Sequence, residues 1–281
     1  MRCAASLCLL FALTPRPLLA AHASPRAPQN QTALTPLQLE IEKQRRRLSS
    51  GEQEERRDAV QRLGAMARPE ASRVASVALG DSSVAVRATA ARAVLSLGPQ
   101  DAATLLLPLL RDKDEFVRRE TAYALGLAGH RMAVPALATA LARDKEAGVR
   151  GAAAVALGQI GDPSAVGPLS EALNRGTGRG GFLSRVTRRT REENEFVRRA
   201  AAVSLGQIAS REAVPALVAA LSNERAGDDV RREAARALGL VGDPSAAPAL
   251  RAVLDARDPY LSQIAEESLR KLGPTQAARP T

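Results

Sequence analysis

A repeated Val-Arg pair sets the period of this chain. The first residue of this pair, called here the Val position, is Val in five units and a different residue in the first and last units. In chain order the Val positions are Glu55, Val86, Val117, Val149, Val197, Val230 and Leu261. Successive positions are separated by 31, 31, 32, 48, 33 and 31 residues. A nearly constant period of this length is typical of a solenoid, in which each unit is one supersecondary motif that stacks on the next.

The residues that follow each Val position predict a helix. Most units carry Ala five positions later and Leu or Val eight positions later, as in Ala122 and Leu125. Offsets of five and eight return to one face of an α-helix, so each unit begins with an amphipathic helix, here called the A helix. A glycine twelve positions after the Val, such as Gly129 or Gly161, predicts the left-handed residue at which this helix ends.

A second helix, the B helix, follows in each unit. The motifs at residues 161–163 and 242–244 read Gly-Asp-Pro, which supplies a capping oxygen and a proline suited to a first helical turn. An apolar stripe such as Val134, Leu137 and Leu141 comes after the turn. Because one hairpin of this length cannot offset its own ordering cost, stacking must complete the core. The sequence therefore predicts an all-α fold, a right-handed α-solenoid of about six or seven helical hairpins.

The segments outside the repeats differ in composition. We expect the solenoid over residues 51–273 and an amphipathic N-terminal capping helix over residues 36–50. Residues 24–35 are rich in Pro, Gln and Asn and are typical of a linker. Residues 274–281 are expected to form a disordered tail.

The first 23 residues have the order of a secretory signal peptide. One arginine precedes an apolar run over residues 3–13, and the stretch ends in Ala-His-Ala at residues 21–23. The run is about half of the roughly 20 residues that a membrane-spanning helix needs. Cleavage after Ala23 removes both cysteines and predicts an exported protein, periplasmic or extracellular, without disulfides. The alternative is an uncleaved, disordered tail on a cytosolic protein.

The repeat motif carries a family resemblance. The pattern DxxVRRxAAxALGxIGDPxAVPALxxAL, seen over Val149–Leu173 and Phe196–Leu221, resembles the HEAT-like repeat of phycobilisome lyase subunits and of many other bacterial proteins. The resemblance covers about residues 52–273 and implies HEAT-like hairpins in an armadillo-like superhelix. It implies little about function, because solenoids of this kind serve many roles.

The residue inventory argues against catalysis and against a metal or cofactor site. His130 is the one histidine left after signal cleavage, and it stands where other units carry the Asp of Gly-Asp-Pro, so a turn role is expected. Metal sites of the His/Cys type need several such ligands. The His-Glu pairs with which the related deoxyhypusine hydroxylases bind iron do not occur. We therefore predict no catalytic residues, no metal and no cofactor.

A bilin-lyase-like accessory role is the enzymatic alternative that the resemblance suggests. Such a protein must hold an extended tetrapyrrole, but the mature chain offers few aromatic side chains for it, namely Phe116, Tyr123, Phe182, Phe196 and Tyr260. Phe116 and Phe196 both precede the Val position by one residue, which predicts a packing role. The export signal also argues against pigment assembly in the cytoplasm.

The arginine after each Val position recurs in register, as Arg56, Arg87, Arg118, Arg150, Arg198 and Arg231. In HEAT-like folds such an arginine joins a ladder of aspartates between repeats. The resemblance therefore implies a structural role for this set rather than a role in ligand binding.

The interval of 48 residues locates an insertion of about sixteen residues within residues 174–194. Six arginines against Glu192 and Glu193 give this segment a charge of +4. Insertions in solenoids either carry binding residues or are tolerated as mobile loops, and both readings stay open. The residues predicted to bind a partner are Arg175, Arg179, Phe182, Arg185, Arg188, Arg189 and Arg191 in the insertion, and Arg143, Glu171 and Arg251 on the B helices.

These observations favour an exported, non-enzymatic scaffold that binds a protein partner. The binding surface is expected on the concave face, which we predict the B helices to line, on the insertion, or on both. The alternative is binding of a polyanion or an anionic surface through the arginine-rich insertion. The scarcity of aromatic residues argues against nucleic acid as that polyanion.

Overall fold

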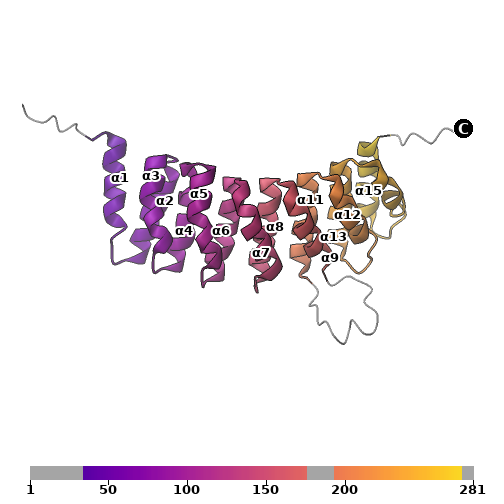
Figure 1. Ribbon diagram of the computed structural model, residues 1–281, viewed down its shortest axis with the longest axis horizontal. Helices are drawn as coiled ribbons and strands as arrows, with labels where there is room; N and C mark the ends of the chain where they lie inside the picture. Colours follow the sequence, from indigo (N-terminus) through magenta and orange to yellow (C-terminus); the bar gives the residue numbers. More distant parts are fainter. Residues whose placement is uncertain (1–33, 176–192, 274–281) are drawn as a thin grey trace, which may run out of the picture.

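The computed structural model describes residues 34–175 and 193–273, and within them the chain forms fourteen α-helices joined by turns and short 3₁₀ segments. Figure 1 shows these helices as a single row of hairpins. The predicted all-α solenoid is confirmed. The predicted signal peptide, most of the linker, most of the insertion and the tail lie outside the described residues. No helix of the described part is long and apolar enough to cross a membrane.

The A helices form one layer of the solenoid. Their buried faces carry the predicted Val positions, since Val86, Val117 and Val149 are each almost fully buried. In chain order the A helices are α2 (Gln53–Ala65), α4 (Val84–Ala93), α6 (Glu115–Ala128), α8 (Ala147–Ile160), α11 (Glu195–Ile208), α13 (Asp228–Val241) and α15 (Pro259–Leu272).

The B helices form the second layer. Asp162 and Asp243 accept hydrogen bonds from the backbone N–H groups of Ser164 and Ser245 at 2.9 Å, which is the capping contact expected of the Gly-Asp-Pro motif. Six B helices are described, namely α3 (Pro69–Ala75), α5 (Pro99–Leu106), α7 (Val134–Arg143), α9 (Val166–Asn174), α12 (Val214–Leu221) and α14 (Ala247–Arg251).

A further helix, α1 (Pro36–Arg47), precedes the first hairpin. It opens with a capping box, in which Thr35 Oγ1 accepts from the backbone N–H of Gln38 at 3.3 Å and Gln38 Oε1 accepts from the backbone N–H of Thr35 at 2.8 Å. Ile41 is buried in the core of the solenoid. The helix thus covers apolar surface of the first unit that has no preceding repeat.

The left-handed residue that ends the A helix falls at the predicted glycine in the third, fourth and sixth units, whereas Gly98 and Gly273 have positive φ with extended ψ values of 162° and 171°, so the prediction is wrong there. Gly129, Gly161 and Gly242 have φ values of 70°, 71° and 70°. The first and fifth units carry alanine at the same position, and Ala67 and Ala209 adopt φ values of 49° and 53°. An L-residue in this region costs about 1–2 kcal/mol, so these two alanines are strained.

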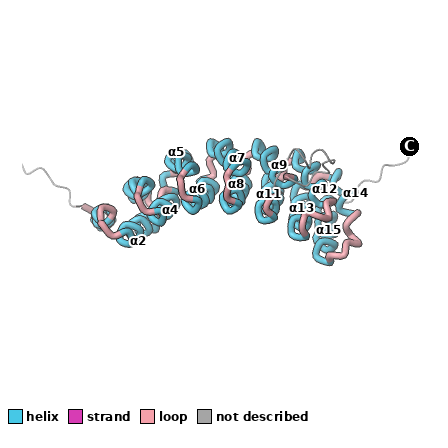
Figure 2. Tube along the Cα trace, turned by 90° about the horizontal axis from the view of Figure 1, so that it is seen from below, coloured by secondary structure: helices cyan, strands magenta, loops and turns pink. Residues whose placement is uncertain are grey.

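The row of hairpins is curved, and Figure 2 shows that the A helices α6, α8, α11, α13 and α15 line its concave side. The prediction that B helices line this side is wrong. Neighbouring A helices approach closely through small residues: a Cβ added at Gly126 would lie 2.8 Å from Ala156 Cα, and one added at Gly206 would lie 3.0 Å from Ala237 Cα. Close spacing in the A layer makes it the shorter, inner side of the arc.

Candidate functional site

The four aromatic residues of the described chain all lie on A helices. Phe116, Phe196 and Tyr260 precede the Val position, and they are 40%, 50% and 65% exposed, while Tyr123 is half-buried. The packing role predicted for Phe196 is confirmed by its ring, which lies against Gly151 of α8, and both Phe116 and Phe196 also keep a large part of their surface exposed to solvent. We define the concave face as the A-helix positions one before, two after and six after the Val position.

Each exposed aromatic ring is held in place by the preceding A helix or by an arginine. The ring of Phe196 occupies the space that a Cβ on Gly151 of α8 would fill. The guanidinium of Arg119 lies 5.1 Å from the centre of the Phe116 ring, and that of Arg232 lies 5.2 Å from the Tyr260 ring. Cation–π contacts of this kind fix ring orientation and leave one face of the aromatic group accessible.

A recess of about 450 Å³ opens on the concave face between α2, α4 and α6. The recess exists because α4 carries Ala85 and Ala88 at the repeat positions where α6 carries Phe116 and Arg119. Its floor is apolar, and its rim is charged and aromatic. The lining residues are Val60, Gly64, Ala88, Ala93 and Thr89, with Arg57, Gln61, Arg92, Phe116 and Glu120 around them.

The charged side chains beside the recess form ion pairs with one another, at distances of 3.0–3.8 Å. Glu120 lies 3.8 Å from Arg92 and 3.7 Å from Arg119, so one carboxylate serves two guanidinium groups. Arg57 pairs with Glu54 at 3.0 Å within its own helix. Three arginines against two glutamates leave one positive charge in excess at this end of the concave face.

The predicted ladder of arginine and acidic residues joins the repeats at the N-terminal ends of the A helices. Three rungs are bidentate and repeat the same geometry, with guanidinium–carboxylate distances of 2.7–3.1 Å in the pairs Arg56–Asp81, Arg87–Asp112 and Arg118–Asp144. In each case Nη1 of the arginine also donates to two backbone carbonyls five and six residues earlier. Charge-assisted, bidentate contacts of this type fix the register between units.

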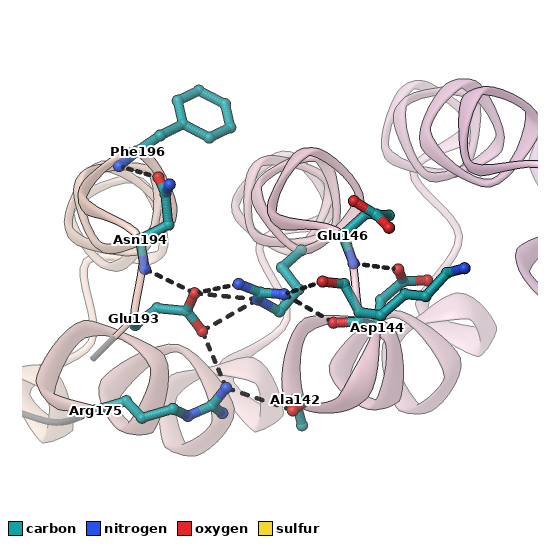
Figure 3. Close-up of polar contacts among 9 residues, drawn as sticks. Ala142, Asp144, Glu146, Arg175, Glu193, Asn194 and Phe196 are labelled. Atoms are coloured by element: carbon teal, nitrogen blue, oxygen red, sulfur yellow. Dashed lines mark hydrogen bonds and ion pairs between the residues drawn. The ribbon is translucent and has the colours of Figure 1, made fainter. Parts of the chain in front are cut away.

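The fourth rung uses a glutamate from the insertion, as Figure 3 shows. Glu193 is almost fully buried, and it accepts from Nε and Nη2 of Arg150 at 3.0 and 2.7 Å, from Nη1 of Arg175 at 3.0 Å and from the backbone N–H of Asn194 at 2.9 Å. It thus takes the ladder position of an aspartate although 43 residues separate it from Arg150. The glutamate fixes the end of the insertion to the solenoid.

The aspartates of the ladder titrate below their usual range. The hydrogen bond with Arg56 is the main cause that lowers the pKa of Asp81. For Asp112 and Asp144, burial is the largest single influence and raises the pKa. The arginine pair, a backbone N–H and nearby cations together outweigh it, so the pKa of both carboxyl groups is lowered.

The ladder changes geometry after the insertion. Nε of Arg198 donates to the backbone carbonyl of Leu173 at 3.0 Å, and Nε of Arg231 donates to that of Leu221 at 3.0 Å. The carboxylate rung of the sixth unit is made instead by Arg232, which contacts Asp258 at 2.7 and 2.9 Å. The ladder role that the sequence assigns to Arg231 is thus taken by the next residue.

Of the four described residues that were predicted to bind a partner, the structure brings Arg175 and Glu171 together, at 3.8 Å. Arg175 is half-buried at the base of the insertion, where it contacts Glu193 and the backbone carbonyl of Ala142. Arg143, Glu171 and Arg251 are exposed on B helices, away from the concave face. The remaining predicted residues, Arg179, Phe182, Arg185, Arg188, Arg189 and Arg191, lie outside the described residues. The exposed aromatic residues of the A helices were not predicted as a site.

His130 is a turn residue, as expected from its place in the repeat. Its Nδ1 accepts from the backbone N–H of Met132 at 3.3 Å at the start of a 3₁₀ turn. Within residues 34–175 and 193–273, no group of three His, Cys, Asp or Glu side chains is arranged to hold a metal ion.

Solved structures of other proteins resemble this chain in fold. The YibA protein of Escherichia coli is 21% identical, with a TM-score of 0.56 and coverage of 85% of this chain and 82% of that one. An engineered protein is 22% identical, with a TM-score of 0.52 and coverage of 83% and 68%. The complex of CpcE and CpcF of phycocyanin lyase from a Nostoc species is 21% identical, with a TM-score of 0.49 and coverage of 92% and 100%.

The family assignment rests on the sequence itself. No curated protein matches the chain. The family model for HEAT repeats matches residues 43–126, 105–179 and 184–270, which together make up well over half of the chain. The chain belongs to the HEAT repeat family.

Proposed function

We propose that this chain is an exported, non-enzymatic scaffold that binds a protein partner on its concave face. The observation that carries the proposal is the placement of Phe116, Phe196 and Tyr260, which are exposed on the A helices. Aromatic residues and arginine are enriched at the centres of protein interfaces, where they supply most of the binding free energy. Exposure of scarce aromatic residues on one face supports an interface there.

The distribution of charge along the concave face supports a protein partner rather than a polyanion. α8 itself contributes no charge to this face, because Gly148, Gly151 and Val155 occupy the three defined positions, and Arg119 of α6 lies beside Gly148. On both sides arginines are paired with acidic residues, as in Arg119–Glu120 before α8 and Arg199–Asp229 after it. An apolar centre with a polar rim is the usual anatomy of a protein interface, whereas a polyanion needs a run of unopposed cations.

Binding of an anionic surface through the insertion is the second candidate. Six arginines and two glutamates within residues 174–194 favour it. One of these glutamates, Glu193, and one of these arginines, Arg175, contact each other at 3.0 Å, so the remaining charge of the insertion is carried by residues 176–192. Binding of this kind weakens steeply with salt.

The proposal that the protein is exported and has no catalytic activity rests on its sequence. The first 23 residues have the pattern of a signal peptide, and the chain after them contains one histidine and no cysteine. One histidine and no cysteine leave little scope for catalysis by an imidazole or a thiol.

The test is capture of a partner from the cell envelope by crosslinking and pull-down. The bait is residues 24–281, compared with a Phe196→Ser/Tyr260→Ser variant and with a chain that lacks residues 176–192. We expect a partner that is captured by the full bait and by the deletion, but not by the Ser variant. Capture that survives in the Ser variant and is lost in the deletion would refute the concave face and select the insertion.

A further inference from the structure

The recess between α2, α4 and α6 is an open hollow in the concave face. Its volume of about 450 Å³ exceeds the volume of any single side chain. The floor consists of Val60, Gly64, Ala88 and Ala93, which offer carbon atoms and no side-chain hydrogen-bonding group. Filling such a space with an apolar group removes apolar surface from water on both partners.

The rim of the recess adds a requirement on charge. Arg92 lies at the rim and shares the carboxylate of Glu120 with Arg119. Since Glu120 serves both Arg92 and Arg119, a carboxylate from a partner would pair with one of these arginines and leave Glu120 to the other. A cationic partner would meet the excess positive charge and would be repelled.

From these two features we propose that the recess receives one apolar side chain of a partner polypeptide, with an Asp or Glu beside it in the partner's sequence. The inference rests on the proposed function and names the chemistry of the segment that is bound. Phe116 forms one wall, and its ring is oriented by Arg119, so an inserted side chain packs against an aromatic surface.

The charge of the chain itself argues against an intramolecular occupant. Residues 1–33 contain three arginines and no Asp or Glu, and residues 274–281 contain one arginine and no Asp or Glu. Residues 176–192 contain Glu192 as their one acidic residue among five arginines. A second copy of the chain, with a net charge of +10, is also a poor electrostatic match for this end of the concave face. These facts favour a separate, acidic partner segment.

The experiment is selection of a displayed library of random dodecapeptides on the purified chain from residue 24 to 281. We expect the selected peptides to share an apolar residue next to Asp or Glu. The same selection is then run on Ala88→Leu, which fills the recess from its floor, and on Ala142→Leu, which adds the same atoms at an exposed position of α7. Enrichment should disappear with Ala88→Leu and persist with Ala142→Leu.

One selected peptide is then measured by fluorescence anisotropy. Ala88→Leu should raise the Kd of the peptide by about tenfold or more, which is the usual effect of losing a side chain buried at the centre of an interface. Arg92→Gln should raise the Kd by about threefold to fivefold and make the Kd less dependent on salt concentration. Arg62→Gln is the matched control, because Arg62 is similarly exposed but does not line the recess. Far-UV circular dichroism and thermal melts confirm that each variant folds.

The outcomes separate this inference from the proposed function. No enrichment on the unmodified chain, enrichment of basic peptides, or peptides that bind Ala88→Leu equally well would overturn the inference. If such peptides, or a partner captured from the envelope, nevertheless fail to bind the Phe196→Ser/Tyr260→Ser variant, the concave face remains the binding surface and the recess does not contribute.

Discussion

Glu193 is the residue at which the ladder and the insertion meet, and its removal has a calculable cost. In the Glu193→Ala variant, Arg150 loses its carboxylate partner and Arg175 loses the nearer of its two, while 16% and 22% of their side chains remain exposed. Removing one partner of a buried ion pair costs about 3–5 kcal/mol. Arg150 keeps its contacts with the backbone carbonyls of Asp144 and Lys145, so we expect a loss near the lower end, about 3 kcal/mol.

The assay for this prediction is equilibrium unfolding in urea, followed by far-UV circular dichroism. Glu171→Ala is the matched control, because Glu171 also lies near Arg175, at 3.8 Å, but its side chain is 75% exposed. An exposed pair contributes little, so this control should change the unfolding free energy by less than about 0.5 kcal/mol. If Glu193→Ala proves no more destabilising than Glu171→Ala, the buried contacts of Glu193 do not hold the two flanking units together.

Three further predictions follow from the backbone, the ladder and the helix contacts. Ala209→Gly and Ala67→Gly should each raise the unfolding free energy by about 1 kcal/mol in urea titrations, because glycine relieves the left-handed strain; an unchanged or lower value would show that no strain is present. The pKa of Asp112 is lowered in the folded state. Its contribution to the free energy of unfolding is therefore complete above about pH 3.9, the pKa in the unfolded chain, and is lost as the pH falls through the pKa in the folded chain. Stability should therefore drop between about pH 5 and about pH 2, with a shallower drop in Asp112→Asn; equal pH slopes would contradict this. Gly126→Ala should lower the melting temperature through a loss of about 1–3 kcal/mol, whereas Gly167→Ala, which meets open space, should not lower it; the reverse order would refute the packing argument.

The fold could be predicted from the sequence because the same local signals recur in every unit. The Val position, the helical offsets of five and eight and the glycine twelve residues later all agree on one hairpin, and the structure forms these hairpins, with the left-handed glycine in the third, fourth and sixth units. Local and long-range preferences that agree in this way specify a single structure. At Ala67 and Ala209 the repeated position imposes the left-handed conformation even though the residue is not glycine.

The features that the sequence did not reveal depend on contacts between units. Glu193 looks like a charged residue of a loop, and only the path of the chain brings its carboxylate between Arg150 and Arg175. The choice of Arg232 over Arg231 depends on which guanidinium reaches Asp258. A repeat alignment alone does not contain this geometry.

The concave face was misassigned for a related reason. Helices of both layers are amphipathic, and this pattern does not say in which layer neighbouring helices lie closer together. The contacts Gly126–Ala156 and Gly206–Ala237 decide it, because they bring neighbouring A helices together and leave their aromatic side chains on the inner side of the arc. Small residues that recur at A-helix contacts were the available signal.

The most direct test of the account is site-specific photocrosslinking from the two faces of the solenoid. A photoreactive phenylalanine analogue replaces Tyr260 on the concave face or Arg143 on α7, both of which are exposed. After irradiation of intact cells, the account predicts one crosslinked protein partner from position 260 and none from position 143. A partner crosslinked from position 143 and absent from position 260 would contradict the claim that the concave face is the binding surface.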